Sequence, residues 1–190
     1  MLDLFFKMCI IMDKISINKI SKNIYKQKGF PSGSFNTCFT CKCGKNGEGS
    51  ACCKNGVYVD KESYELIIKH KKPLEQKIGL KIEKCFDDEW SDDTEFLGKK
   101  SIGTKVIDNT CSFRSRTGQG CEIVRLVLEN NLPRRMIPSG CRLYPLTWSK
   151  GKIFLEKIEK NCVCINKHNK TNKSIYETQK DEIDDIFCFE

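Results

Sequence analysis

The spacing of apolar residues along the chain predicts three helices. Tyr64, Ile67 and Ile68 follow an i, i+3, i+4 pattern, which predicts a helix that begins after Asp60 and runs to about residue 71, with Pro73 as its stop. Residues 120–131 predict a second helix, and residues 173–190 predict a terminal one. The expected apolar face of the second helix consists of Cys121, Val124, Val127 and Leu128.

Short segments with β-prone or alternating residues predict strands between these helices. They are residues 57–59, residues 102–107, and residues 111–113 after a turn at Asp108 and Asn109. Residues 143–148 and 153–158 flank a Ser-Lys-Gly-Lys turn and predict a β-hairpin. Together the patterns favour a small α+β domain with short helices and a hairpin.

Breaker residues and charge divide the chain further. A stretch rich in Gly, Pro and Ser at residues 29–34 predicts a linker, so residues 1–35 are expected to form an N-terminal extension or helix. Residues 36–166 then form the main domain, and residues 167–190 contain the C-terminal helix. Six acidic side chains in residues 87–95 predict a solvated loop, because blocks of like charge are usually solvated.

Composition changes this picture through one residue type, since 13 of the 190 residues are cysteine. The first residues lack the basic, apolar and small-residue pattern of a secretory signal, and they are too short an apolar run to span a membrane. We therefore expect a cytoplasmic protein with no membrane partner. In a reducing compartment, clustered cysteines favour metal ligation over disulfides.

The cysteines fall into groups along the sequence. Ten of them form the candidate ligand set, namely Cys38, Cys41, Cys43, Cys52, Cys53, Cys111, Cys121, Cys141, Cys162 and Cys164. Cys9, Cys85 and Cys188 lie outside the groups and are expected to be buried or tolerated thiols. His70 and His168 lie among lysines and are expected on the surface, so the site would be all-sulfur.

The spacing does not choose between zinc and iron. Structural zinc sites usually have two C-x₂₋₄-C pairs, whereas this chain has one, at Cys38 and Cys41. Common ferredoxin spacings are absent as well. Ten candidates exceed one tetrahedral site, so the expected cofactor is a zinc ion, two ions, or an iron–sulfur cluster. Cys121 is expected to open a helix, whose N-terminus favours the thiolate form.

The order of these motifs resembles the YkgJ-type cysteine-cluster family, described as zinc- or iron-chelating domains, and a similar cluster occurs in flagellin lysine N-methylases. The motifs are C-x₂-C and C-C, then Gly-Val-Tyr-Val-Asp at 56–60, Cys-Ser-Phe at 111–113, Gly-Cys-Glu-Ile at 120–123, and Cys-Arg-Leu-Tyr-Pro-Leu at 141–146. The resemblance covers roughly residues 38–164. It implies a ligand set of Cys38, Cys41 or Cys43, Cys52, Cys53, Cys111, Cys121 and Cys141, with Cys162 and Cys164 second in rank.

Three functions remain open from the sequence. The first is a metal-binding cysteine-cluster protein with an otherwise unknown role. The second, by the resemblance, is an iron–sulfur protein methyltransferase with a protein substrate, although residues 44–49 match no nucleotide-binding fingerprint. The third is a zinc-dependent nucleic-acid-binding module, suggested by the net charge of +8. It is the least favoured because no nucleic-acid recognition motif accompanies the charge and the arginines could offset thiolates. The arginines concerned are Arg114, Arg116, Arg125, Arg134, Arg135 and Arg142. Catalytic residues stay unknown.

Overall fold

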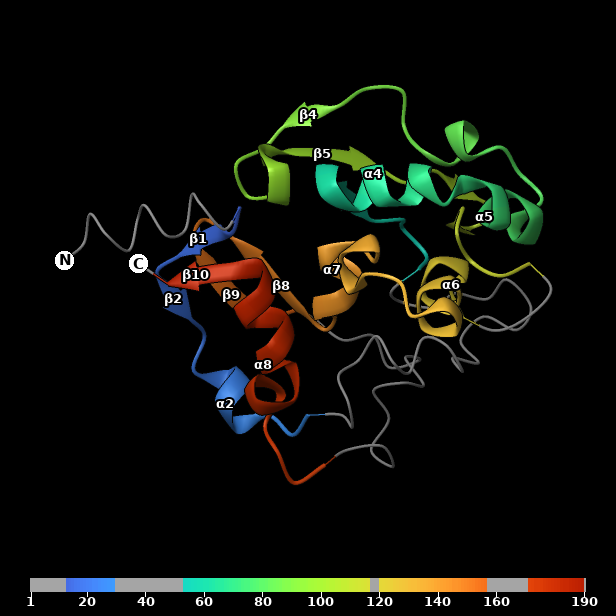
Figure 1. The fold of residues 1–190 in the computed structure, drawn as a ribbon. Coiled ribbons are helices and arrows are strands. Elements are labelled where there is room, and N and C mark those ends of the chain that lie inside the picture. The colour runs from blue at the N-terminus through green and yellow to red at the C-terminus, as the bar shows by residue number, and fades with distance from the viewer. Residues whose placement is uncertain (1–12, 30–52, 117–119, 157–170, 190) are drawn as a thin grey trace.

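The computed structural model describes residues 13–29, 53–116, 120–156 and 171–189. Within them, helices and several small sheets make an α+β arrangement, as expected. The buried apolar side chains form two clusters, which we call the first core and the second core. Figure 1 shows the elements of the first core at the top and right of the view, and those of the second core at the left.

The first core is built between a three-stranded antiparallel sheet and short helices. The sheet has the order β3-β5-β4, and Val59 of β3 lies opposite Ile102 of β5. Val59 and Ile102 are both buried, and so are Ile67, Leu74, Ile123 and Val127 from the surrounding helices. The elements are β3 (Tyr58–Asp60), α4 (Lys61–Lys69), α5 (Lys71–Ile78), η1 (Ile82–Cys85), β4 (Ser91–Asp92), β5 (Lys100–Gly103), β6 (Val106–Ile107), β7 (Thr110–Cys111), α6 (Glu122–Asn130) and η3 (Arg134–Met136).

The second core joins the two ends of the chain to the hairpin. Strand β1 runs parallel to β10, and β2 runs parallel to β9, the second strand of the hairpin. Ile183 and Ile186 of α8 are fully buried against this layer. The elements are β1 (Ile15–Ile17), β2 (Lys19–Ile20), α2 (Asn23–Lys26), β8 (Leu146–Ser149), β9 (Lys152–Leu155), α8 (Ile175–Ile186) and β10 (Phe187–Phe189), with η2 (Leu97–Lys99) contributing Leu97.

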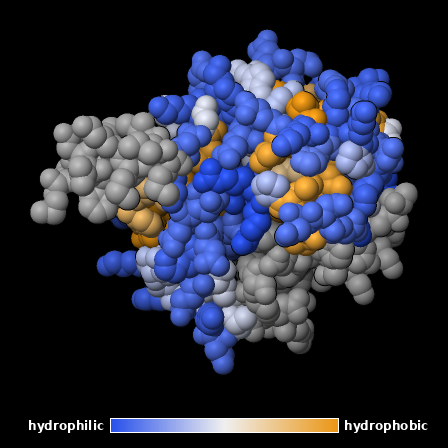
Figure 2. All heavy atoms as spheres, in the orientation of Figure 1, coloured by the Kyte–Doolittle hydropathy of each residue, from blue (hydrophilic) through white to orange (hydrophobic). Residues whose placement is uncertain are grey.

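A five-residue helix, α7 (Ser139–Leu143), lies between the two cores and contacts β3 on one side and α8 on the other. Figure 1 shows it at the centre of the molecule. Gly140 suits this position because an added Cβ would lie 3.1 Å from the Val57 side chain. The surface over this region is a strongly hydrophilic band with hydrophobic patches to either side (Figure 2).

The helix predicted after Asp60 is present, but its end is wrong. Helix α4 ends at His70, and Pro73 lies in the first turn of α5 rather than beyond a helix. A proline is tolerated there because amides in the first turn have no carbonyl partner inside the helix. The proline therefore falls within a helix instead of ending one.

The second predicted helix corresponds to α6, which ends at Asn131 in a left-handed conformation. Its predicted apolar face is partly wrong, since Leu128 is 43% exposed. The buried face consists of Ile123, Val124, Leu126 and Val127.

The remaining local predictions hold with shifted ends. The hairpin forms as β8 and β9, and Asp108 and Asn109 make the turn between β6 and β7 with positive φ angles. The terminal helix begins at Ser174, and the chain then becomes the strand β10 instead of staying helical. The acidic loop is exposed, with Asp88 and Asp92 paired to nearby lysines. No helix among the described residues is long and apolar enough to cross a membrane.

Candidate metal centre

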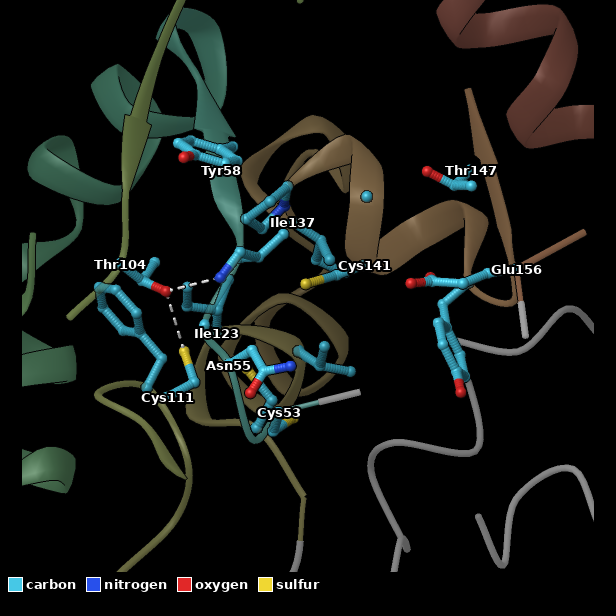
Figure 3. Close-up of a pocket in the computed structure, with 18 of the residues that line it drawn as sticks. Cys53, Asn55, Tyr58, Thr104, Cys111, Ile123, Ile137, Cys141, Thr147 and Glu156 are labelled. Carbon is cyan, nitrogen blue, oxygen red and sulfur yellow. Dashed lines mark hydrogen bonds between the residues drawn. The ribbon is translucent and has the colours of Figure 1, made fainter. Parts of the chain in front are cut away.

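Four of the ten predicted ligands lie in the described residues, and all four line one cavity. Cys53, Cys111, Cys121 and Cys141 come from four separate segments and border a space of about 390 Å³. Figure 3 shows Cys53, Cys111 and Cys141 around it. Residues up to 88 positions apart in sequence therefore meet at one place, at the edge of the first core.

Backbone pairing holds the first two thiols together. The amide of Cys111 donates a hydrogen bond to the carbonyl of Cys53 at 2.6 Å. Cys111 ends β7, and its thiol lies 3.4 Å from the hydroxyl of Thr104, which also accepts a hydrogen bond from the amide of Val57. Gly56 allows this packing, because its φ is +72° and an added Cβ would lie 2.6 Å from the Thr104 carbonyl oxygen. The Thr104 hydroxyl thereby links the Cys111 thiol to the chain that follows Cys53.

Cys121 is the N-cap residue of α6, as the sequence predicts. An isolated β-bridge to Arg114 brings the chain back from β7 to this point. Burial raises the pKa of the Cys121 thiol, and the nearby Cys53 and Cys111 thiols raise it further. The amides of Ile123 and Val124 at the helix N-terminus act in the opposite direction but are outweighed.

Cys141 lies on α7, which a buried carboxylate holds in place. Asp60 is fully buried, and its side chain accepts hydrogen bonds from the amides of Ser139 (2.9 Å) and Leu97 (3.1 Å). Asp60 thus caps α7 instead of its own helix, α4. Because Ser139 is two residues before Cys141, this contact fixes the part of the chain that presents the thiol.

The four thiols interact electrostatically. Burial raises the pKa of the Cys141 thiol well above its ordinary value, and Cys121, Cys53 and Cys111 raise it further. Burial likewise raises the pKa of Cys111, with Cys53 adding to the effect and Thr104 opposing it. Neutral thiols are therefore the stable form at neutral pH in the absence of a cation.

The thiols share a cavity without converging on one point. Among the residues that the structure describes, no group of three or more His, Cys, Asp or Glu side chains has the geometry to hold a metal ion. Cys38, Cys41, Cys43, Cys52, Cys162 and Cys164 lie outside the described residues, as does Cys9.

The other two cysteines predicted to be bystanders behave differently from each other. Cys85 is a fully buried thiol of the first core and does not border the cavity, as expected. Cys188 on β10 is disulfide-bonded, so the prediction of a tolerated free thiol is wrong for this residue. Its half-buried position on an edge strand gave no sequence signal for this bond. His70 is half-buried at the junction of α4 and α5, whereas the sequence predicted an exposed side chain.

A second part of the cavity lining was missed by the sequence. Beyond the thiols, the cavity is bordered by the aromatic side chains of Tyr58, Phe96 and Trp148 and by two carboxylates, Glu95 and Glu156. These residues come from β3, the approach to η2, and the hairpin. No spacing in the sequence links them, because each joins the cavity through tertiary packing.

The arginines near the cysteines pair with carboxylates. Arg142 is 1% exposed and lies 2.9 Å from Glu182 and 2.7 Å from Asp185, both on α8. Arg135 contacts Asp185 and Glu62, and Arg134 contacts Glu182. Arg116 and Arg125 also have acidic partners. These ion pairs differ from the predicted role of offsetting thiolates.

No protein-family model, curated protein or solved structure matches this chain.

Proposed function

We propose that this protein is a metal-binding cysteine-cluster protein whose centre includes Cys53, Cys111, Cys121 and Cys141. The observation that carries the proposal is the convergence of these four thiols, from four distant segments, on one cavity. Four sulfur donors match the number that a tetrahedral zinc ion or one cubane iron–sulfur cluster takes from a protein. The resemblance to YkgJ-type domains belongs to the same proposal.

The electrostatics of the cavity support a cationic occupant. Four neutral thiols crowded at the edge of a core gain little from one another, and their ionisation is opposed by burial and by mutual repulsion. A bound cation reverses this balance because thiolates coordinate soft and borderline metals strongly. Metal binding then releases protons and adds to folding stability.

Closing on a single ion requires the thiols to move nearer one another, since a zinc ion holds each sulfur at ~2.3 Å. A polynuclear cluster is larger and needs less convergence. Both cofactors remain within the proposal. The protein-methyltransferase alternative stays a proposal that rests on the resemblance alone, and the nucleic-acid alternative loses support because the arginines are engaged with carboxylates.

The proposal is tested by purifying the protein without oxygen and measuring its metal content and visible absorption. We expect bound zinc with a featureless spectrum, or iron and acid-labile sulfide with a broad band near 400 nm, about the region where thiolate-to-iron charge transfer absorbs. Replacing Cys111 or Cys141 by Ser should lower the bound metal to a small fraction of the wild-type amount. Metal-free wild-type protein that is folded and takes up neither zinc nor iron would contradict the proposal.

Cys85 provides a matched control for these variants. It is a buried thiol of the same core, and its position away from the cavity separates loss of a ligand from loss of any buried sulfur. Cys85→Ser should retain metal at the wild-type stoichiometry. If Cys85→Ser and Cys111→Ser lose metal equally, the cavity thiols have no special role.

A further inference from the structure

The cavity is larger than a metal centre alone needs. Its volume of about 390 Å³ lies in the range of roughly 300–1,000 Å³ that is typical of small-molecule sites. The four thiols border one part of it, and the aromatic and acidic side chains border the rest. In Figure 3, Tyr58 and Glu156 lie on opposite sides of Cys141. The part of the cavity beyond the thiols is therefore available to a second ligand.

Three aromatic rings form a continuous wall of this part. The rings of Tyr58 and Phe96 have centroids 6.1 Å apart and are inclined by 64°, and those of Phe96 and Trp148 are 5.6 Å apart and inclined by 60°. Rings inclined in this way form a concave surface. The indole of Trp148 is held in place by its N–H, which donates a hydrogen bond to the Glu95 carbonyl at 2.6 Å.

The charges on this side of the cavity are negative. Glu95 is half-buried beside Phe96, and Glu156 is exposed at the end of the hairpin. A positive charge, Arg114, also borders the cavity, but it is 5% exposed and its backbone bridges to Cys121, which places it at the thiol side. Aromatic faces and carboxylates both attract cations, whereas an anion would be repelled here.

We propose that the aromatic and acidic part of the cavity binds an organic ammonium ion, with its alkyl groups against Tyr58, Phe96 and Trp148 and its charge balanced by Glu95 and Glu156. Quaternary ammonium groups suit such a site because they are weakly hydrated and attracted to aromatic faces. This assignment goes beyond the proposed metal centre and needs none of the four thiols.

The test is isothermal titration of the purified protein with choline and with 3,3-dimethyl-1-butanol, a neutral molecule of the same shape. We expect choline to bind and the neutral analogue to bind at least about tenfold more weakly, since it lacks both the cation–π and the ionic attraction. Equal affinity for the two compounds, or no binding of choline at millimolar concentration, overturns the proposal.

Two exposed side chains allow variants that leave the cores intact. Tyr58 is 59% exposed and Glu156 is exposed, so Tyr58→Leu and Glu156→Gln should fold normally. Each is expected to weaken choline binding roughly fivefold, which corresponds to about 1 kcal/mol. Circular dichroism and metal content should stay at wild-type values, which distinguishes failure here from failure of the metal centre.

Matched substitutions away from the cavity serve as controls. Tyr25 is an exposed aromatic residue near the second core, and Glu89 is an exposed acid of the acidic loop. Tyr25→Leu and Glu89→Gln should bind choline as the wild type does. If they weaken binding as much as Tyr58→Leu and Glu156→Gln, the attraction is non-specific and the proposed site is wrong.

Discussion

The two cores of this protein are filled by different chemistry. The second core consists of Ile, Leu and Phe side chains packed between α8 and short strands. The first core has a similar aliphatic centre, but Cys53, Cys85, Cys111, Cys121 and Cys141 lie in it or against it, and it borders a cavity of about 390 Å³. Hydrocarbon packing therefore suffices to close one core, whereas the other leaves a thiol-lined space that we assign to a metal.

The junction between the cores is polar and buried. Arg142 on α7 pairs with Glu182 and Asp185 on α8, while Asp60 caps the other end of α7. Burial raises the pKa of Glu182 despite the opposing arginines, whereas hydrogen bonds from Arg135 and Arg142 outweigh burial and lower that of Asp185. The segment that presents Cys141 is thus fixed by charges on both sides.

The largest expected effect is the loss of this junction. Arg142→Met leaves Glu182 buried with a weakened set of partners, and removing one member of a buried ion pair costs about 3–5 kcal/mol. Urea unfolding should show a destabilisation of about this size. The exposed Lys180–Asp184 pair on the same helix is the control, and Lys180→Ala should change stability little. Equal, small effects would mean that the cores are not joined through Arg142.

Truncating one aliphatic side chain in each core sharpens the comparison. Ile123 in the first core and Ile183 in the second are both buried, and Ile→Ala in a core costs about 2–5 kcal/mol. Only the first core is expected to hold metal, so Ile123→Ala should lower metal retention while Ile183→Ala should not. Metal analysis of the two folded variants checks this. Equal metal loss in both would show that the centre depends on overall stability alone.

Alkaline pH should weaken the first core through a thiol outside the metal centre. Burial raises the pKa of Cys85 to about 11, with Ser112 opposing the effect. Below pH 9 the thiol is protonated in both the folded and the unfolded chain, so stability is unaffected. Between about pH 9 and 11 the unfolded chain ionises first, and stability falls by up to about 2–3 kcal/mol.

Urea unfolding as a function of pH measures this loss. The Cys85→Ala variant should show a smaller decrease over the same interval, because its share of the ionisation is gone. An identical pH profile for the two proteins would mean that Cys85 ionises as easily in the folded chain as in the unfolded one.

The smallest expected effect lies at the start of α8. The Ser174 hydroxyl accepts a hydrogen bond from the Glu177 amide, and the Glu177 carboxylate accepts one from the Ser174 amide. Ser174→Ala removes half of this capping box and should cost about 1 kcal/mol. Thermal unfolding checks the stability, and metal content should be unchanged because the cap belongs to the second core. A loss of metal in Ser174→Ala would contradict the separation of the two cores.

The local elements were predictable because their signals are local. The periodicity of α6, the turn at Asp108 and Asn109, and the position of Cys121 at a helix start follow from nearby residues. The parallel pairings of β1 with β10 and of β2 with β9 were not predictable, since they join segments more than 130 positions apart and carry no spacing signal. Domain boundaries from the sequence stay a prediction.

The candidate site divides in the same way. Cysteine grouping identified the four thiols of the cavity, because sulfur is rare and its clustering is visible in one dimension. The aromatic wall was missed because Tyr58, Phe96 and Trp148 are common core residue types whose meeting depends on tertiary packing. Arg142 was assigned near the thiols by sequence proximity, whereas its partners lie on a helix that follows more than 30 residues later.

The metal content of the four single variants Cys53→Ser, Cys111→Ser, Cys121→Ser and Cys141→Ser, purified without oxygen beside Cys85→Ser, tests the central claim most directly. We predict that each of the four variants loses most of its bound zinc or iron while Cys85→Ser retains it. Wild-type metal content in all four variants, or no metal in the folded wild-type protein, would contradict the account.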